Sequence, residues 1–441
     1  MFYSQAFIYF RALVATVLAY IRAFVWKLSA GGAVPARPGD RSLSAVWLRQ
    51  VLEANGYRGF SIKSMQIGDN ANNRGLDGSI NKIHLEYEPA DASVSLPPTR
   101  FVLKTSVSGF TGRAKTMCQR SFRESWFYAS ALFRNLAPNY PRVFYSYGSS
   151  LMGEMVALAE DISVIPGATP ANFVFGNQIW GIPVEVKPKR DEVATLECVF
   201  TQAARMHALY WKDDTLLKPQ QSWLKHNGWY SNQGREEWEV ALNKIWNYWK
   251  RGKSRALDTS SGLKFSPRLI AIVDKSFETS SWEKVQAQVQ NKNIPFTLTH
   301  GDFHASNMFV VRDADTDKDR AIWFDWSEVG PWEPTADLAQ MFISDVKPAV
   351  TKANAKRIVR AYYDELIKNG VSQNEYSWET CWNTFCQNGP EKWIWLLPLL
   401  LDLGLPTNAM QYFHDQVFSF IEAFCPNKDA FEIKSLAHLL G

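Results

Sequence analysis

The sequence reads His-Gly-Asp-Phe-His-Ala-Ser-Asn over residues 300–307, and Ala-Ile-Trp-Phe-Asp-Trp follows over residues 321–326. Apolar runs at 308–311 and 321–324 predict two short strands, and the polar residues between them predict a connecting loop. A hairpin of this kind would return Asp325 towards Asn307. We therefore expect Asp302, Asn307 and Asp325 to lie close together.

These three residue types suit phosphoryl transfer from a nucleotide. A γ-phosphoryl group carries charge that metal ions must neutralise, and the accepting hydroxyl must be oriented while it loses its proton. Asp302 suits the role of base, and the side-chain oxygens of Asn307 and Asp325 are ligands that Mg²⁺ prefers. The alternative, in which His300 and Asp302 only cap a turn, does not account for the second Asp.

Residues 300–307, together with the Gly-Pro turn and Asp-Leu-Ala ending of the segment 325–339, resemble the aminoglycoside phosphotransferase and choline kinase-like superfamily, including its ecdysteroid-kinase-like branch. This resemblance implies an α+β fold, two-lobed and protein-kinase-like, with a small sheet-containing N-lobe and a mainly helical C-lobe. It also implies ATP and Mg²⁺ as cofactors and a small-molecule acceptor. By the same matching, Asp302 is the catalytic base, Asn307 and Asp325 bind the metal, and Asp337 is a structural carboxylate that braces the loop.

A lysine and a glutamate in the N-terminal half predict an ion pair. The strand 100–107 carries Lys104, which on its own reads as an ordinary solvated lysine. In the predicted helix 115–134, Glu124 falls on the same face as apolar residues, and burying an unpaired carboxylate is expensive. We therefore expect Lys104 to pair with Glu124, and the resemblance assigns Lys104 to the phosphates of ATP.

A glycine-containing loop joins two further predicted strands, 61–67 and 80–88. Glycine lets a backbone approach phosphates closely, so Gly75, Gly78 and Ser79 are candidate nucleotide-binding residues. An ordinary polar hairpin loop would have the same composition. The strand 155–159 is expected to lead into the hinge between the lobes, by resemblance alone.

The C-terminal half reads as mainly helical. In the helix 192–211, His207 is expected to be a satisfied core histidine. Several helices follow over 349–425, and the apolar stretch 393–401 contains Pro398 and is too short to span a membrane. In related kinases such helices shape the acceptor pocket, but no sequence pattern in 212–290 or 349–425 identifies the acceptor molecule. The alternating aspartates 313–319 lack the glycine and glutamate of a calcium loop.

Residues 1–29 differ from the rest because they are largely apolar and contain no acidic residue. Three interpretations remain open: a helix lying on or anchored in a membrane, a cleaved targeting peptide, and an accessory helix packed on the kinase. Ser29–Asp40 is rich in Gly, Pro and Ala and reads as a flexible connection. The protein is expected to be cytoplasmic, with membrane association through residues 1–29 or organelle targeting left open.

The overall composition is compatible with an enzyme of this kind. A net charge of +4 on 48 basic and 44 acidic residues is too small an excess to indicate a nucleic-acid-binding surface. The five cysteines have no Cys-x-x-Cys spacing and read as reduced thiols.

We predict an apolar N-terminal helix (1–29), a linker (30–43), a nucleotide-binding N-lobe (44–160) and a catalytic C-lobe (161–441). The predicted function is an ATP-dependent kinase for a small-molecule hydroxyl. The alternative is a catalytically silent pseudokinase that binds a nucleotide or a partner.

Overall fold

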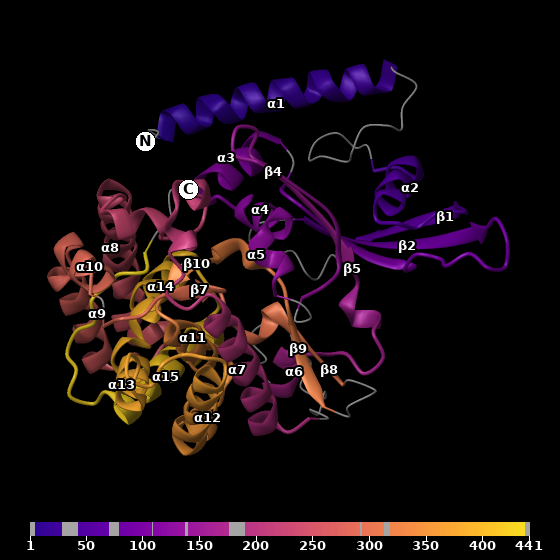
Figure 1. Cartoon of the computed structure of the whole chain (residues 1–441). Helices are drawn as coiled ribbons and strands as arrows, with labels where there is room; N and C mark the ends of the chain where they lie inside the picture. Colours follow the sequence, from indigo (N-terminus) through magenta and orange to yellow (C-terminus); the bar gives the residue numbers. More distant parts are fainter. Residues whose placement is uncertain are drawn as a thin grey trace. The chain divides into compact units, whose positions relative to one another are not determined.

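The computed structural model describes residues 5–28, 43–69, 79–107, 109–136, 140–175, 190–291, 293–312 and 318–436. The chain divides into two compact units, the first ending at Pro166 and the second beginning at Gly167. The first unit contains one large sheet, and the second is mainly helical (Figure 1). The predicted fold class, α+β with a sheet-containing N-terminal part and a mainly helical C-terminal part, is confirmed.

The sheet of the first unit has five antiparallel strands in the order β1-β2-β3-β5-β4. Their bounds are β1 (Phe60–Asp69), β2 (Ser79–Pro89), β3 (Arg100–Thr105), β4 (Val143–Ser149) and β5 (Glu154–Glu160). The helix α2 (Ala45–Ala54) begins at Ser44, whose side chain accepts the backbone N–H of Trp47. Its apolar face packs on the sheet, where Trp47 and Leu52 join the buried strand residues Phe101 and Leu103.

The predicted helix 115–134 is wrong as a single helix, because three shorter helices occupy the region: α3 (Gly109–Gln119), α4 (Arg123–Ala129) and α5 (Ala131–Arg134). Arg120 adopts a left-handed backbone conformation (φ 55°), which ends α3. Ser130 is extended, and its hydroxyl accepts the N–H of Phe133, so it caps α5 instead of continuing α4. The apolar periodicity continues across both breaks and conceals them.

The N-terminal helix α1 (Gln5–Leu28) lies along α3 within the first unit. Its small residues Ala12 and Ala15 are buried against α3, and Arg22 bonds Glu154 at 2.8 Å. The opposite face exposes ten large apolar side chains. They are Phe7, Tyr9, Phe10, Leu13, Val14, Val17, Leu18, Tyr20, Ile21 and Phe24. Among the described residues, no helix has both the length and the apolarity needed to cross a bilayer.

In the second unit, three short antiparallel strands carry the segment singled out from the sequence: β6 (Thr169–Pro170), β8 (Met308–Arg312) and β9 (Asp319–Trp323). The predicted hairpin is therefore present, as β8 and β9. A separate antiparallel pair consists of β7 (Thr297–Thr299) and β10 (Gly330–Trp332). The predicted alternating aspartates 313–317 and the loop glycines Gly75 and Gly78 lie outside the described residues.

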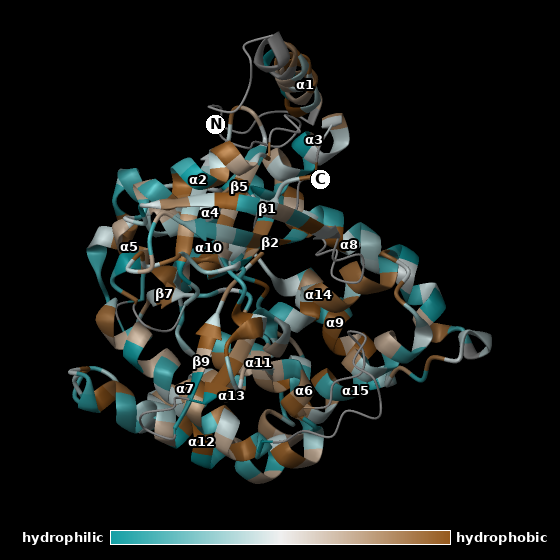
Figure 2. Ribbon diagram, turned by 90° about the vertical axis from the view of Figure 1, so that its right-hand side faces the viewer, coloured by the Kyte–Doolittle hydropathy of each residue, from teal (hydrophilic) through white to brown (hydrophobic). Residues whose placement is uncertain are grey.

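Helices make up most of the second unit. They are α6 (Ala171–Phe175), α7 (Glu192–Leu209), α8 (Arg235–Leu257), α9 (Pro267–Thr279), α10 (Trp282–Val289), α11 (Thr335–Asp345), α12 (Pro348–Lys368), α13 (Trp378–Asn388), α14 (Glu391–Asp402) and α15 (Thr407–Phe424). The predicted buried helix near 391–403 is α14, which Figure 2 draws mostly in the hydrophobic colour. None of the five cysteines forms a disulfide.

Candidate active site

The loop His300–Asn307 connects β7 to β8 and requires a glycine at its second position. Gly301 has φ +78°, a conformation that other residues rarely adopt. A Cβ there would lie 2.2 Å from the backbone oxygen of Glu328, which is far inside van der Waals contact. The second position of the predicted motif therefore requires glycine, because there is no room for a side chain.

Asp337, in the first turn of α11, holds the start of this loop. Its Oδ2 accepts the backbone N–H of His300 at 2.8 Å, and its Oδ1 accepts that of Gly301 at 3.0 Å. The carboxylate is 2 % exposed. Hydrogen bonds from two buried N–H groups to one carboxylate fix the backbone strongly. The bracing role predicted for Asp337 is present in the structure.

His300 and His207 have structural surroundings. The N–H at Nε2 of His300 donates to the carbonyl oxygen of Phe324 (3.0 Å), and its Nδ1 accepts the backbone N–H of Asp302 (3.3 Å). Burial lowers the pKa of His300, which favours this neutral form over the pull of nearby aspartates. His207 is fully buried, as expected for a core histidine, and its Nδ1 bonds the hydroxyl of Tyr362 at 2.8 Å. Its Nε2 lies 3.5 Å from Oδ2 of Asp337 and makes no hydrogen bond within the described residues, so the histidine is only half satisfied.

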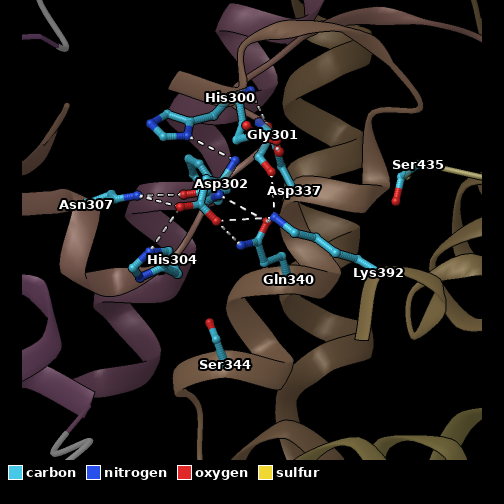
Figure 3. A network of polar contacts seen from close by, with 12 residues as sticks. His300, Gly301, Asp302, His304, Asn307, Asp337, Gln340, Ser344, Lys392 and Ser435 are labelled. Atoms are coloured by element: carbon cyan, nitrogen blue, oxygen red, sulfur yellow. Dashed lines mark hydrogen bonds and ion pairs between the residues drawn. The ribbon is translucent and has the colours of Figure 1, made fainter. Parts of the chain in front are cut away.

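Asp302 lies at the centre of a polar network (Figure 3). Its Oδ1 accepts the side-chain amide of Gln340 at 2.7 Å and lies 3.2 Å from Nζ of Lys392. Its Oδ2 accepts the amide of Asn307 at 3.2 Å and lies 3.4 Å from Nε2 of His304. The side chain remains 32 % exposed, so the carboxylate is both oriented and accessible.

The charges around Asp302 keep it ionised. Burial alone would raise the pKa of Asp302, but the Lys392 ammonium, followed by His304 and the amide of Gln340, holds it well below its ordinary value. Burial would lower the pKa of His304, but its neighbour Asp302 raises it. The site thus combines a carboxylate with a low pKa and two adjacent cationic or partly cationic groups.

The hairpin of β8 and β9 brings the backbone next to Asp325 against Asn307. The N–H of Phe324 donates to the carbonyl oxygen of Asn307 at 3.0 Å, which places Asp325 one residue beyond this bond. Asp325 has φ 63°, a conformation that costs energy for a non-glycine residue and is concentrated at functional sites.

The side-chain oxygens of these two residues are compatible with Mg²⁺. The Asn307 amide nitrogen is turned to Asp302, which leaves the carbonyl oxygen as the group for a cation. Among the described residues, no group of three or more His, Cys, Asp or Glu could hold a metal ion. Mg²⁺ is commonly held by one or two protein oxygens plus substrate phosphates and water, so the short donor set suits it.

In the first unit, the predicted pair of Lys104 and Glu124 is present. Lys104 Nζ on β3 lies 2.7 Å from Glu124 Oε2 on α4, and their side chains are 17 % and 3 % exposed. The hydroxyl of Tyr128 donates to the other oxygen of Glu124 at 2.9 Å. Ser79 opens β2 and pairs with Thr105, the residue after Lys104. Of the predicted nucleotide-binding residues, Lys104, Glu124 and Ser79 are described, while Gly75 and Gly78 are not.

Two polar residues in the Asp302 network were missed by the sequence reasoning. Gln340 lies one helical turn beyond Asp337 on α11, so the spacing of three residues could have identified it. Lys392 also donates to the carbonyl oxygen of Gly301 at 2.7 Å and to Oε1 of Gln340 at 2.9 Å. It lies more than eighty residues from the loop in sequence, and no local pattern marks it.

A hollow of about 470 Å³, open to solvent, adjoins the network within the second unit. Its lining includes Gly301, Gln340 and Lys392 next to Asp302, and Trp332 and Ser435 further away. A small molecule in this hollow would contact the groups that bond Asp302.

Residues 188–374 match the ecdysteroid kinase-like family. The match contains the loop 300–307, Asp325 and Asp337, and it confirms the resemblance predicted from those motifs. No curated protein is significantly similar to the chain in sequence.

Several solved structures of small-molecule kinases are similar to the chain. An ethanolamine kinase from Plasmodium vivax has 11 % identity and a TM-score of 0.40, with 82 % of each chain covered. A choline kinase from Cryptosporidium parvum Iowa II has 10 % identity and a TM-score of 0.43, covering 81 % of this chain and 88 % of that one. The amicoumacin kinase hAmiN, in complex with AMP-PNP, Ca²⁺ and Ami, has 12 % identity and a TM-score of 0.41, covering 88 % and 97 %. At these TM-scores nothing about the reaction of this chain follows from the likeness.

Proposed function

We propose, starting from the ecdysteroid kinase-like match over residues 188–374, that this protein is an ATP-dependent phosphotransferase acting on a hydroxyl group of a small molecule. The observation that carries the proposal is the environment of Asp302, a partly exposed carboxylate that four side chains orient beside a hollow. A base for phosphoryl transfer needs this combination of fixed direction and access.

In the proposed reaction, Asp302 orients the acceptor hydroxyl. The hydroxyl oxygen bonds to the γ-phosphorus, the bond to the bridging oxygen breaks, ADP leaves, and the hydroxyl proton passes to Asp302. A carboxylate with a lowered pKa is ionised at neutral pH and binds a proton weakly. It therefore acts mainly by orientation and accepts the proton as the new bond forms, which suits a loose transition state.

Cofactor roles follow from the same chemistry. We assign Asn307 and Asp325 to Mg²⁺, which when bound would neutralise charge on the transferred phosphoryl group. We assign Lys104 to the phosphates of ATP, with Glu124 holding its ammonium at 2.7 Å. Gly75, Gly78 and Ser79 remain proposed contacts to the nucleotide, and their support is the sequence pattern.

The test uses the full chain and an undirected search for the acceptor. Purified protein is incubated with ATP, Mg²⁺ and a metabolite extract, and mass spectrometry identifies species that gain one phosphate. Asp302→Asn keeps the size of the side chain and should slow product formation by about 10² to 10⁴-fold. Asp191→Asn serves as the control, because Asp191 only caps α7 and asparagine caps equally well.

Three outcomes are informative. A phosphorylated product that depends on Asp302 supports the proposal. Equal rates for Asp302→Asn and wild type would contradict the assignment of the base. Nucleotide binding without any product would favour the alternative, a silent pseudokinase.

We also propose that α1 associates with a lipid surface. Its small residues pack on α3 while ten large apolar side chains face outward, and contiguous exposed apolar surface of this kind marks a membrane or protein contact. Residues 1–29 contain no acidic residue that anionic lipid would repel.

A further inference from the structure

A second hollow in the C-terminal unit has no part in the proposed reaction. It encloses about 570 Å³, including its opening to solvent, and lies between the end of α9, the turn from α13 to α14, and the segment 428–434. Its lining includes three lysines, Lys284, Lys428 and Lys434. It shares Asn388 and Glu391 with the hollow beside Asp302, so the two are neighbours.

Lys434 is a buried lysine in the wall of this hollow. The residue is 6 % exposed, yet within the described part of the chain its ammonium group makes no hydrogen bond or ion pair. The carboxylate of Glu391 attracts this ammonium group from beyond ion-pair distance, while its Oε1 accepts the backbone N–H groups of Lys434 (2.6 Å) and Ser435 (2.9 Å). Burial lowers the pKa of Lys434, while the carboxylates of Glu391, Glu432 and Glu333 act to raise it. A largely buried lysine with no carboxylate in direct contact is stabilised when a ligand supplies negative charge beside its ammonium group.

Lys428 faces the same hollow and adds a second positive charge. Its Nζ donates to the carbonyl oxygen of Gln387 and lies 4.7 Å from the ring centre of Phe431. Burial and the charge of Lys434 both lower the pKa of Lys428. Neither lysine has a carboxylate within ion-pair distance among the described residues. Two like charges therefore line one hollow, and among the described residues the nearby carboxylates of Glu391 and Glu432 lie beyond ion-pair distance of both.

The remaining features of the hollow also favour an anion. Lys284 lies at its rim, 3.6 Å from Glu432, and both side chains are more than 40 % exposed. The helix α14 begins at Glu391 in the wall of the hollow, and the N-terminus of a helix favours negative charge. Thr279 and Asn388 supply neutral polar groups.

We propose that this hollow binds a phosphate group, either as the free ion or as part of a phosphate monoester, through the ammonium groups of Lys428 and Lys434. Two ammonium groups in the lining of one hollow match the charge and the several acceptor oxygens of a phosphate dianion. The proposal does not depend on the proposed kinase activity, because the site lies apart from Asp302 and binding alone tests it.

The test is calorimetric titration of the full chain with inorganic phosphate at constant ionic strength, with sodium chloride as the blank. Lys434→Met and Lys428→Met should each weaken binding roughly 10- to 100-fold, because each removes a charge-assisted hydrogen bond. Lys275→Met is the matched control. It removes a half-exposed lysine of α9 that pairs with Asp429 outside the hollow, so phosphate affinity should not change.

Two further arms make the result specific. Lys104→Met should leave the titration unchanged, since a loss there would place the phosphate at the nucleotide site and overturn the proposal. Glycerol 3-phosphate compared with inorganic phosphate distinguishes a monoester ligand from the free ion.

Thermal melting separates misfolding of a variant from loss of phosphate binding. Lys434→Met should melt no lower than wild type without phosphate, and it should lose the rise that phosphate gives wild type. Binding by Lys434→Met equal to wild type would overturn the proposal.

Discussion

Replacing Asp337 by asparagine tests whether one buried carboxylate fixes the loop that contains Asp302. Asp337 uses both oxygens, one for the N–H of His300 and one for the N–H of Gly301. Asparagine has only one carbonyl oxygen, so one buried N–H would face an amide NH₂ group instead of an acceptor.

The expected cost follows from these two bonds. An unsatisfied buried donor costs about 1–3 kcal/mol, and the surviving bond weakens by about 1 kcal/mol because it is no longer charge-assisted. We therefore expect Asp337→Asn to lower the free energy of unfolding of the second unit by about 2–4 kcal/mol. At the same time, loss of the fixed loop should reduce turnover by more than tenfold.

The assay is urea unfolding followed by tryptophan fluorescence, since Trp323 and Trp326 are buried close to the loop. Asp191→Asn is the matched control. Its carboxylate accepts one backbone N–H, from Ala194, which the carbonyl oxygen of asparagine accepts equally well, so its effect should stay within about 0.5 kcal/mol. Equal effects of the two substitutions would refute the reasoning.

Three further predictions concern other residues. Lys392→Met should lower kcat at least about tenfold with little change in the KM for ATP, because Oδ1 of Asp302 loses one of the groups that orient it. Lys392→Arg should restore part of the rate. An unchanged kcat for Lys392→Met in steady-state kinetics would contradict this prediction. Burial raises the pKa of Glu333 to about 7 from 4.5, so the folded state binds the proton more tightly than the unfolded state. The free energy of unfolding should therefore fall by up to about 3 kcal/mol as pH rises from 4.5 to about 7. Urea unfolding of Glu333→Gln should lack this pH dependence, and an identical pH dependence would exclude Glu333 as its source. Phe10→Gln with Ile21→Gln should reduce flotation of the protein with anionic vesicles severalfold, and equal flotation would argue against a lipid contact of α1.

The sequence predicted best where chemistry and local periodicity coincide. The hairpin of β8 and β9 follows from two apolar runs with a polar loop between them, and it brings Asp325 back to Asn307 through the bond from Phe324. The pair of Lys104 and Glu124 was predictable because a carboxylate in an apolar stripe needs a cation. Both inferences depend only on short spacings and on the cost of burying charge.

Prediction from the sequence failed where local backbone geometry or contacts between distant residues determine the structure. The apolar stripe over 115–134 runs on through the breaks at Arg120 and Ser130, so periodicity predicted one helix where there are three. Lys392 reaches the loop through tertiary packing of α14, which no short spacing reveals. The phosphate proposed for Lys434 is equally invisible in the sequence, because it depends on which residues surround that lysine in three dimensions.

Two consecutive residues of α14 connect distant parts of the second unit. Glu391 binds the backbone of residues 434 and 435, and Lys392 binds Asp302 and Gly301. The backbone of residues 434 and 435 and the loop of Asp302 are thus both held by the start of α14. Removing the residues from 434 onwards, or attaching a bulky tag there, is therefore expected to change the position of Asp302 although neither change contacts it.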